Sequence, residues 1–278
     1  MKLDRHFFLG CVIALLSTSF VTAAENKMFL TCTNEEEFTI IAEQDFFPNT
    51  GLYKGKLRGF SFDIMMAAFS AVNCRPKIRV TPYKRCLNEI ETGRALGCFN
   101  TTNSSENQRK YILHKKPLFR GEIFIYGHPD SSGLFSQSDY YSNSFSVVRG
   151  YTYTDDFDSD TRIKKIIVGT DKQTLALVSK KRADFALVYK KVAQFEMNRI
   201  TNTIASKPVP VKKHVGFDLF VSFSKKKPEK SLRLASILDN GLNIIRANGT
   251  YAKIEKSWKS WLKTGLKYGN PAPLWQSE

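Results

Sequence analysis

The chain has 278 residues, and its 42 Lys and Arg against 26 Asp and Glu give it a formal net charge of +16 at pH 7. This length can bury the core of one large or two modest domains. The basic residues stand in short, scattered groups that do not interleave with aromatic residues. This pattern indicates a solvated surface and argues against a nucleic-acid partner.

The first 24 residues are typical of a secretory signal. Lys2 and Arg5 precede an apolar run over residues 7–16, and small residues at 21–24 offer a cleavage site. A membrane anchor is the alternative, but this run is shorter than a bilayer requires, and no later stretch is long and apolar enough. We therefore expect residues 1–24 to be a signal peptide and the mature protein to be periplasmic.

Two segments then repeat an order of strand, helix and strand. In the first, predicted strands cover residues 38–42, 77–81 and 95–100. After the first strand and a polar stretch, apolar residues spaced along one face predict a helix capped by Ser61. A second helix is predicted over residues 85–92.

The second segment follows a stretch rich in Ser, Gly and Asp. Predicted strands cover residues 145–149, 163–169 and 184–189, and a helix is predicted over 172–181. Strands that alternate with helices in this way are typical of α/β units with parallel strands.

Two longer strands are predicted at residues 122–127 and 217–224, and the chain ends in helices. The expected fold class is therefore α/β, with two lobes joined by two hinge strands. Residues 25–127 are expected to begin lobe 1, residues 128–216 to form lobe 2, and residues 217–278 to return as a strand and helices that pack on lobe 1.

Three motifs give the chain a resemblance to a known family. The run Gly-Phe-Ser-Phe-Asp-Ile at 59–64, the segment that leads to Arg109, and Asn-Gly-Thr-Tyr-Ala-Lys-Ile at 248–254 with Trp258 occur in a familiar order. Over residues 36–264 the chain resembles the family 3 extracellular solute-binding proteins, whose members bind polar amino acids for ABC importers. The resemblance implies a hinged fold that closes on a ligand in its cleft.

The same resemblance implies a role for Arg109. The matching family arginine holds the carboxylate of the ligand, and a guanidinium can grip a carboxylate with two parallel hydrogen bonds. The segment before Arg109 is longer here than in the family. An arginine exposed on the surface is therefore the alternative.

Further cleft residues are implied at the carboxyl ends of the predicted strands, where ligands of α/β sheets bind. Lobe 1 is expected to offer aromatic, polar and basic side chains, with simple turn or core packing as the alternative: Phe46, Phe47, Tyr83, Arg85, Asn100, Thr101 and Thr102.

Lobe 2 is expected to contribute Gly150, Thr152 and Tyr189. The turn at Gly150 precedes a helix, and its free amides would favour an anion. Tyr189 stands where amino-acid binders of the family carry an acid for the ammonium of the ligand. Either another acid, such as Asp45 or Asp156, replaces it, or the ligand is not a standard α-amino acid. The net positive charge of the chain weakly favours an anionic ligand.

Four cysteines follow the predicted signal, in an oxidising compartment. In the implied topology, Cys32 and Cys74 lie at the base of lobe 1. Cys86 begins a helix and Cys98 ends a strand, so both are placed near the cleft. The hypothesis is therefore that Cys32 pairs with Cys74 and Cys86 with Cys98, with free thiols as the alternative.

The predicted function is a monomeric binding protein that delivers a small polar solute, an amino acid or a related carboxylate, to the membrane permease of an ABC importer. A sensory receptor component is one alternative. A cyclohexadienyl-dehydratase-like enzyme on the same fold is another, with Glu43, Asp45 or Glu122 as its acid. No catalytic motif is present, so we expect no enzyme activity, no cofactor and no metal.

Overall fold

The computed structural model describes residues 31–32, 37–131, 135–199 and 206–274. The predicted signal peptide at residues 1–24 lies outside these ranges. Among the residues described, no helix has the length and apolar character needed to cross a membrane.

Lobe 1 is built on a parallel sheet of three strands. Strand β1 (Thr39–Glu43) lies between β5 (Lys77–Thr81) and β6 (Gly97–Thr102), and pairs in parallel with both. Strand β1 carries the fully buried residues Ile40, Ile41 and Ala42, because helices cover both faces of the sheet. The predicted strand at 77–81 has the bounds that the structure gives it.

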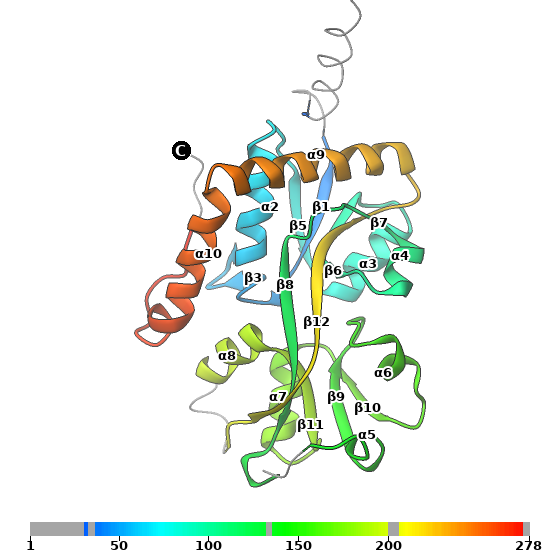
Figure 1. Ribbon diagram of the computed structural model, residues 1–278, viewed down its shortest axis with the longest axis vertical. Coiled ribbons are helices and arrows are strands. Elements are labelled where there is room, and N and C mark those ends of the chain that lie inside the picture. Colours follow the sequence, from blue (N-terminus) through cyan, green and yellow to red (C-terminus); the bar gives the residue numbers. More distant parts are fainter. Residues whose placement is uncertain (1–30, 33–36, 132–134, 200–205, 275–278) are drawn as a thin grey trace, which may run out of the picture.

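Lobe 2 repeats this plan with a second parallel set. Strand β9 (Ser144–Val148) lies between β10 (Lys164–Val168) and β11 (Phe185–Tyr189) and runs parallel to both. The α/β class with two lobes is therefore confirmed. Figure 1 shows the two sets, one above the other, with their strands pointing toward the space between the lobes.

Two long antiparallel strands join the lobes. Strand β8 (Phe119–Gly127) pairs with β12 (Val209–Phe223) from Leu219 opposite Phe119 to Val209 opposite Gly127. One end of β12 pairs with β6, and one end of β8 pairs with β11, so these strands cross from one lobe to the other (Figure 1). Both strands extend beyond their predicted bounds.

The extra length of β12 is in a segment whose residues are partly or fully exposed. Val209 and Pro210 are exposed, and Lys212 and Lys213 point to solvent along the same stretch. This segment lacks the apolar run by which a buried strand is predicted. Pairing with β8, rather than burial, makes it a strand.

Helices cover the sheet and end the chain. Their bounds are α2 (Phe60–Ser70), α3 (Tyr83–Glu91), α4 (Ser105–Lys110), α5 (Asp139–Ser142), α6 (Asp155–Ser159), α7 (Asp171–Ser179), α8 (Lys190–Arg199), α9 (Pro228–Ala247) and α10 (Thr250–Ser260). Short elements complete the fold: β2 (Asp45–Phe46), β3 (Thr50–Tyr53), β4 (Lys56–Arg58), β7 (Ile112–Leu113), a 3₁₀ turn at Pro129–Ser131 and a π-helical turn at Trp261–Gly265.

Strands β2, β3 and β4 form a separate small antiparallel sheet, in the stretch that the sequence indicated only as polar and Gly-rich. This sheet sets the start of α2. The N-cap is Gly59, with a φ of 147°, and a side chain at Gly59 would meet the carbonyl oxygen of Asn49 at 2.1 Å. The prediction that Ser61 caps the helix is wrong, because its hydroxyl is buried and bonds elsewhere.

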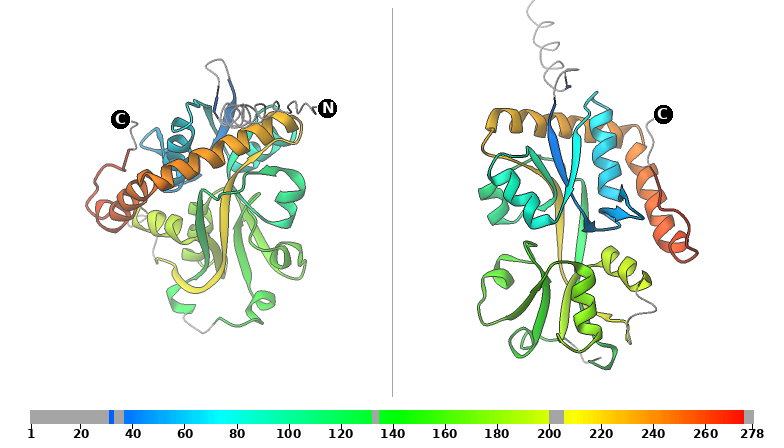
Figure 2. Two further views of the ribbon diagram at one scale, coloured as in Figure 1. Left: turned by 45° about the horizontal axis from the view of Figure 1, so that its top comes forward. Right: turned by 180° about the vertical axis from the view of Figure 1, so that it is seen from behind.

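The terminal helices pack on lobe 1. Helix α9 crosses α2 so closely that a side chain at Gly241 would lie 2.0 Å from the carbonyl oxygen of Ala68. Helix α10 then descends beside α2, as Figure 2 shows from behind. The indole Nε1 of Trp258 donates a hydrogen bond to Oδ2 of the buried Asp63 (2.7 Å).

Trp258→Phe is expected to lower the free energy of unfolding by about 2 kcal/mol. The change keeps an aromatic ring but removes a buried hydrogen bond to a carboxylate, a bond of about 1.5–3 kcal/mol. Urea denaturation measures the difference. Trp261→Phe is the control, since the indole of Trp261 donates to a backbone carbonyl (3.0 Å) rather than to a charged group. An equal loss in both variants would contradict a special role for Asp63.

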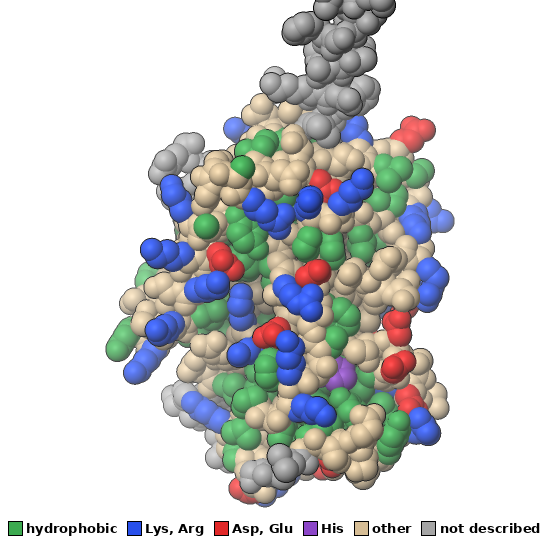
Figure 3. Space-filling view, in the orientation of Figure 1, with side chains coloured by type: hydrophobic (Ala, Val, Ile, Leu, Met, Phe, Trp, Pro, Cys, Tyr) green, Lys and Arg blue, Asp and Glu red, His purple; other side chains and the backbone are tan. Residues whose placement is uncertain are grey.

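The surface agrees with the scattered basic charge of the sequence. Figure 3 shows Lys and Arg side chains distributed over one face of both lobes, mixed with acidic and apolar side chains. Some Lys and Arg side chains of the protein are ion-paired, such as Lys213 with Glu122 and Lys181 with Asp130. This distribution is typical of a solvated surface.

Candidate functional site

The carboxyl ends of the parallel strands of both lobes meet at one cavity, which we call the interlobe cavity. Its lining residues come from the end of β1, from β2, from the start of α3 after β5, from β6, from the turn after β9 and from the end of β11. They are Glu43, Phe46, Tyr83, Asn100, Thr102, Tyr151, Thr152 and Tyr189. Its free volume is about 10 Å³, room for about one water molecule. In this conformation the cavity is too small for a larger molecule.

A larger hollow of about 570 Å³ lies on the outside of lobe 1, where α2, α9 and α10 meet. It is not at the strand ends, and all its lining residues come from lobe 1 or the chain after it. The interlobe cavity is the better candidate, because ligands of α/β sheets bind at the carboxyl ends of the strands.

Four aromatic rings surround the interlobe cavity, two from each lobe. Phe46 of lobe 1 lies 4.9 Å from the ring of Tyr189 and 5.9 Å from that of Tyr151, both of lobe 2. Tyr83 of lobe 1 lies 5.4 Å from Tyr151, and all these pairs meet edge to face. Burial raises the pKa of Tyr83, Tyr151 and Tyr189, so their hydroxyls stay protonated.

The buried carboxyl group of Glu43, in lobe 1, accepts a hydrogen bond from lobe 2. The hydroxyl of Tyr151 donates to Oε1 of Glu43 (2.6 Å) and lies 3.3 Å from Oδ2 of Asp171, the first residue of α7. Glu43 is 4% exposed and Asp171 is 1% exposed. Burial raises the pKa of Glu43 well above its usual range, and burial and the charge of Glu196 raise that of Asp171 to about 8.

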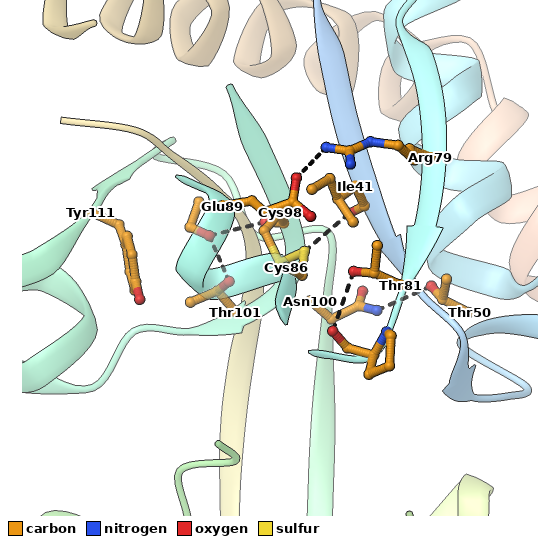
Figure 4. The surroundings of a disulfide bond; sticks show 12 residues. Ile41, Thr50, Arg79, Thr81, Cys86, Glu89, Cys98, Asn100, Thr101 and Tyr111 are labelled. Carbon is orange, nitrogen blue, oxygen red and sulfur yellow. Dashed lines mark hydrogen bonds and ion pairs between the residues drawn. A yellow bond between two sulfur atoms is a disulfide. The ribbon is translucent and has the colours of Figure 1, made fainter. Parts of the chain in front are cut away.

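A chain of hydrogen bonds orients Asn100. The Ser61 hydroxyl donates to the carbonyl of Asn49 (2.8 Å), so its oxygen accepts from Thr50 (2.7 Å). Thr50 then accepts from Nδ2 of Asn100 (3.0 Å), as Figure 4 shows. This order leaves the amide oxygen of Asn100 buried without a partner among the described residues.

A comparison with protein families identifies the chain. The model of the bacterial extracellular solute-binding proteins, family 3, matches residues 38–260. The chain belongs to this family. The resemblance inferred from the three sequence motifs is thereby confirmed. No curated protein sequence matches the chain.

Solved structures show the same fold at low identity. An ancestral arginine-binding protein bound to glutamine is 17% identical, with a TM-score of 0.69 over 81% of this chain and 99% of that one. An ancestral amino-acid-binding protein, a precursor of cyclohexadienyl dehydratase, is 18% identical, with a TM-score of 0.64 over 80% and 95%. A histidine kinase sensor domain similar to periplasmic binding proteins is 18% identical, with a TM-score of 0.66 over 79% and 95%.

In this family 3 solute-binding protein, more than half of the predicted site residues line the interlobe cavity. These are Phe46, Tyr83, Asn100, Thr102, Thr152 and Tyr189. Their contacts with a ligand stay a prediction. The others lie elsewhere. Phe47 stacks on Tyr53 in the core, and Thr101 exchanges a hydrogen bond with Ser222 (2.7 Å). Gly150 and Arg85 are exposed.

Arg109 is also exposed and is not among the lining residues. The longer segment before it forms α4, capped by Ser104, which accepts from the amide of Asn107 (3.2 Å). Arg109 is near the end of this helix, where its carbonyl accepts from Lys225 (2.5 Å). The structure therefore places Arg109 outside the cavity for which it was predicted.

Two central residues of the cavity were missed or given another role. Tyr151 is not among the predicted site residues, and Glu43 is predicted only as the acid of the alternative enzyme. Asp45 and Asp156, the acids suggested in place of Tyr189, are both exposed. One signal was present in the sequence: Glu43 directly follows the apolar run of β1, where a carboxyl group must lie at the sheet edge.

The cysteines pair as predicted, Cys32 with Cys74 and Cys86 with Cys98. One detail differs. Cys98 stands near the start of β6, not at its end, and the strand continues to Thr102. The second disulfide therefore lies behind the cavity, where it fixes α3 to the sheet (Figure 4). Within the described ranges, no group of three or more His, Cys, Asp or Glu side chains could hold a metal ion.

Proposed function

We propose that this chain is the periplasmic binding protein of an ABC importer and that it carries a small polar solute between its lobes to a membrane permease. The observation that supports this is the contact across the interlobe cavity, where Tyr151 of lobe 2 bonds to Glu43 of lobe 1 (2.6 Å). A cavity lined from both lobes couples the binding of a solute to closure.

The proposed mechanism is a difference in affinity between two forms. A solute that contacts both lobes stabilises the closed form more than the open form, and a permease that recognises the closed form thus receives loaded protein. Strands β8 and β12 are the connections about which the lobes would move. The predicted division into residues 25–127, 128–216 and 217–278 is part of this proposal.

The first test uses the mature protein, refolded to remove any solute carried over. A solute at 100 times its dissociation constant is expected to add about 2.7 kcal/mol to the stability. Small-angle X-ray scattering should then show a smaller radius of gyration with the solute. Deletion of the gene should abolish uptake of the same solute. Normal uptake in the deletion strain would refute the importer role and favour a sensor.

Tyr151→Phe is expected to shift the unliganded protein toward the open form. The variant loses the hydroxyl that links the lobes, a hydrogen bond to a carboxyl group of about 1 kcal/mol, which changes the ratio of closed to open forms about fivefold. X-ray scattering should record a larger radius of gyration.

Tyr153→Phe is the matched control, because the hydroxyl of Tyr153 accepts from the amide of Val148 (2.7 Å) within lobe 2. Equal scattering of both variants and the native protein would contradict the role given to the bond between Tyr151 and Glu43.

A dehydratase-like activity is the second candidate function. Glu43 is buried in the cavity with a raised pKa, as a general acid requires. Turnover of prephenate by the refolded protein, and its loss in Glu43→Gln, would establish the enzyme. The absence of turnover in protein that binds solutes would exclude it.

A further inference from the structure

We propose that the solute is a small organic cation, with an ammonium or guanidinium group that binds Glu43 inside the aromatic rings of the interlobe cavity, and that its recognition requires no carboxylate on the solute. This inference rests on the proposed binding function and adds the chemical class of the ligand. It replaces the expectation of an anionic ligand, which was based on the net charge of the chain.

The described ionisable side chains that line the interlobe cavity are one acid and three tyrosines. Among the residues that the structure describes, none of those lining the cavity is Lys or Arg, whereas Glu43 lines it and Asp171 lies next to it, behind Tyr151. The positive charge of the protein is on its surface (Figure 3). When Glu43 ionises, it requires a partner of opposite charge; because no described basic side chain lines the cavity, a solute that enters between parted lobes would supply that charge.

One buried polar atom that lines the cavity lacks a partner among the described residues and is an acceptor. It is the amide oxygen of Asn100, fixed by the chain of bonds through Thr50. A buried acceptor without a donor costs about 1–3 kcal/mol. A ligand that satisfies this oxygen together with the carboxylate of Glu43 must donate several hydrogen bonds, which ammonium and guanidinium groups do and carboxylates do not.

The aromatic rings suit the same ligand. Phe46, Tyr83, Tyr151 and Tyr189 enclose the cavity from both lobes, with neighbouring ring centroids 4.9–6.2 Å apart. Ring faces attract cations within about 6 Å, and more strongly where water is excluded. Tyr189 thus contributes a ring where the resemblance led us to expect an acid, and the acid comes from Glu43.

The residue expected to hold a carboxylate is outside the cavity. Arg109 is exposed on α4, and Arg85 is exposed on α3. A carboxylate on the solute would therefore enter a cavity with no cationic side chain among its described lining residues. A buried carboxylate without a cationic partner costs free energy, so removal of the carboxylate should not weaken binding.

Pairs of probes that differ by one carboxylate test this inference by isothermal titration calorimetry on the refolded protein. The pairs are agmatine with L-arginine and cadaverine with L-lysine; glutarate and a neutral sugar complete the set. The expected result is that at least one of the two amines binds, and binds as tightly as its amino acid or more so, while glutarate and the sugar do not bind.

Each other result overturns the inference in a distinct way. Binding of L-arginine or L-lysine with loss of more than tenfold in the decarboxylated partner would show that the carboxylate is recognised, and would leave the proposed binding function intact. Binding of only glutarate or the sugar would show that the solute is not a cation, and would also leave the proposed binding function intact. No binding by any probe to folded protein would overturn the inference and withdraw support from the binding function as well.

Glu43→Gln gives a second, independent readout. The affinity for the amine that binds is expected to fall about 100-fold, since loss of one partner of a buried charge pair has effects of this size. Glu122→Gln is the matched control. It removes the same charge from an exposed position on β8, and its affinity should stay within twofold of the native value.

The pH dependence keeps the test valid if Glu43→Gln does not fold. Because burial raises the pKa of Glu43, the cation must displace a proton, and the affinity of the native protein should rise from pH 5 to pH 7. Asp171, Asp45 and the hydroxyls of Tyr83, Tyr151 and Tyr189 face the same carboxyl group. An affinity that does not change with pH would overturn the role of Glu43.

Discussion

Asp171→Asn is expected to make the protein more stable than the native protein at pH 7, and this difference is expected to shrink by about 3 kcal/mol between pH 7 and pH 5. The pKa of Asp171 is about 8 in the folded protein against a usual value of 3.8, because the carboxyl group is buried and lies near Glu196. Between pH 3.8 and about pH 8, the carboxyl group is mostly protonated in the folded state and mostly ionised in the unfolded state. The folded state therefore binds more protons in this range. The stability that Asp171 contributes is therefore present at low pH and is lost as the pH rises toward 8, by up to about 1.4 kcal/mol per unit.

The measurement is guanidinium denaturation of both proteins at pH 5, 6 and 7. The difference between them removes groups that do not interact with Asp171, such as His114 and His214, whose pKa values burial lowers and whose effect on stability has the opposite trend with pH. Glu43 and Tyr151 interact with Asp171, so their contribution is part of the difference. Asp156→Asn, an exposed aspartate of α6, is the control and should follow the native curve. A difference between native protein and Asp171→Asn that stays constant with pH would contradict the buried state of this carboxyl group.

Removal of the disulfide between Cys32 and Cys74 is expected to lower the stability by about 4 kcal/mol. The bond closes a loop with a sequence separation of 42 and ties the chain before β1 to the end of α2. A loop of this size gives about 4 kcal/mol through the entropy of the unfolded chain. The double variant Cys32→Ala with Cys74→Ala, measured by guanidinium denaturation, tests this value.

The second disulfide is the comparison. Cys86 and Cys98 are separated by 12 residues, so the same chain-entropy relation gives about 3 kcal/mol. Peptide mapping without reductant first checks that the two pairs exist as the structure has them. Four free thiols, or an unfolding midpoint that a reductant does not change, would contradict both expected losses.

Local patterns in the sequence were enough for the elements that bury one continuous apolar face. The strand at 77–81 has its predicted bounds, and the α/β class follows from the order of strands and helices. The small sheet of β2, β3 and β4 and the first part of β12 could not be predicted in this way. The first part of β12 is a strand because it pairs with the distant β8, and β2, β3 and β4 are strands because these short segments pair with one another. Neither stretch has an apolar period long enough to predict a strand.

At the site, the sequence predicted which residues line the cavity better than it predicted what each residue contacts. It located the strand ends, and so it found Phe46, Tyr83, Asn100 and Tyr189. It did not find the bond from Tyr151 to Glu43, which joins residues 108 positions apart. It also predicted Arg109 in the cleft, whereas the structure has this residue exposed on α4. A motif preserves the order of residues, but it does not determine the direction of a side chain that follows a longer segment.

The sequence by itself determined the family, the two-lobed class and the pairing expected of the cysteines, since these depend on the order and spacing of residues along the chain. The tertiary structure alone decided which ionisable side chains line the cavity. A net charge of +16 describes the surface, where water screens each side chain. Among the described residues the cavity is lined by one acid, Glu43, and by no Lys or Arg, because the fold brings together the strand ends of both lobes.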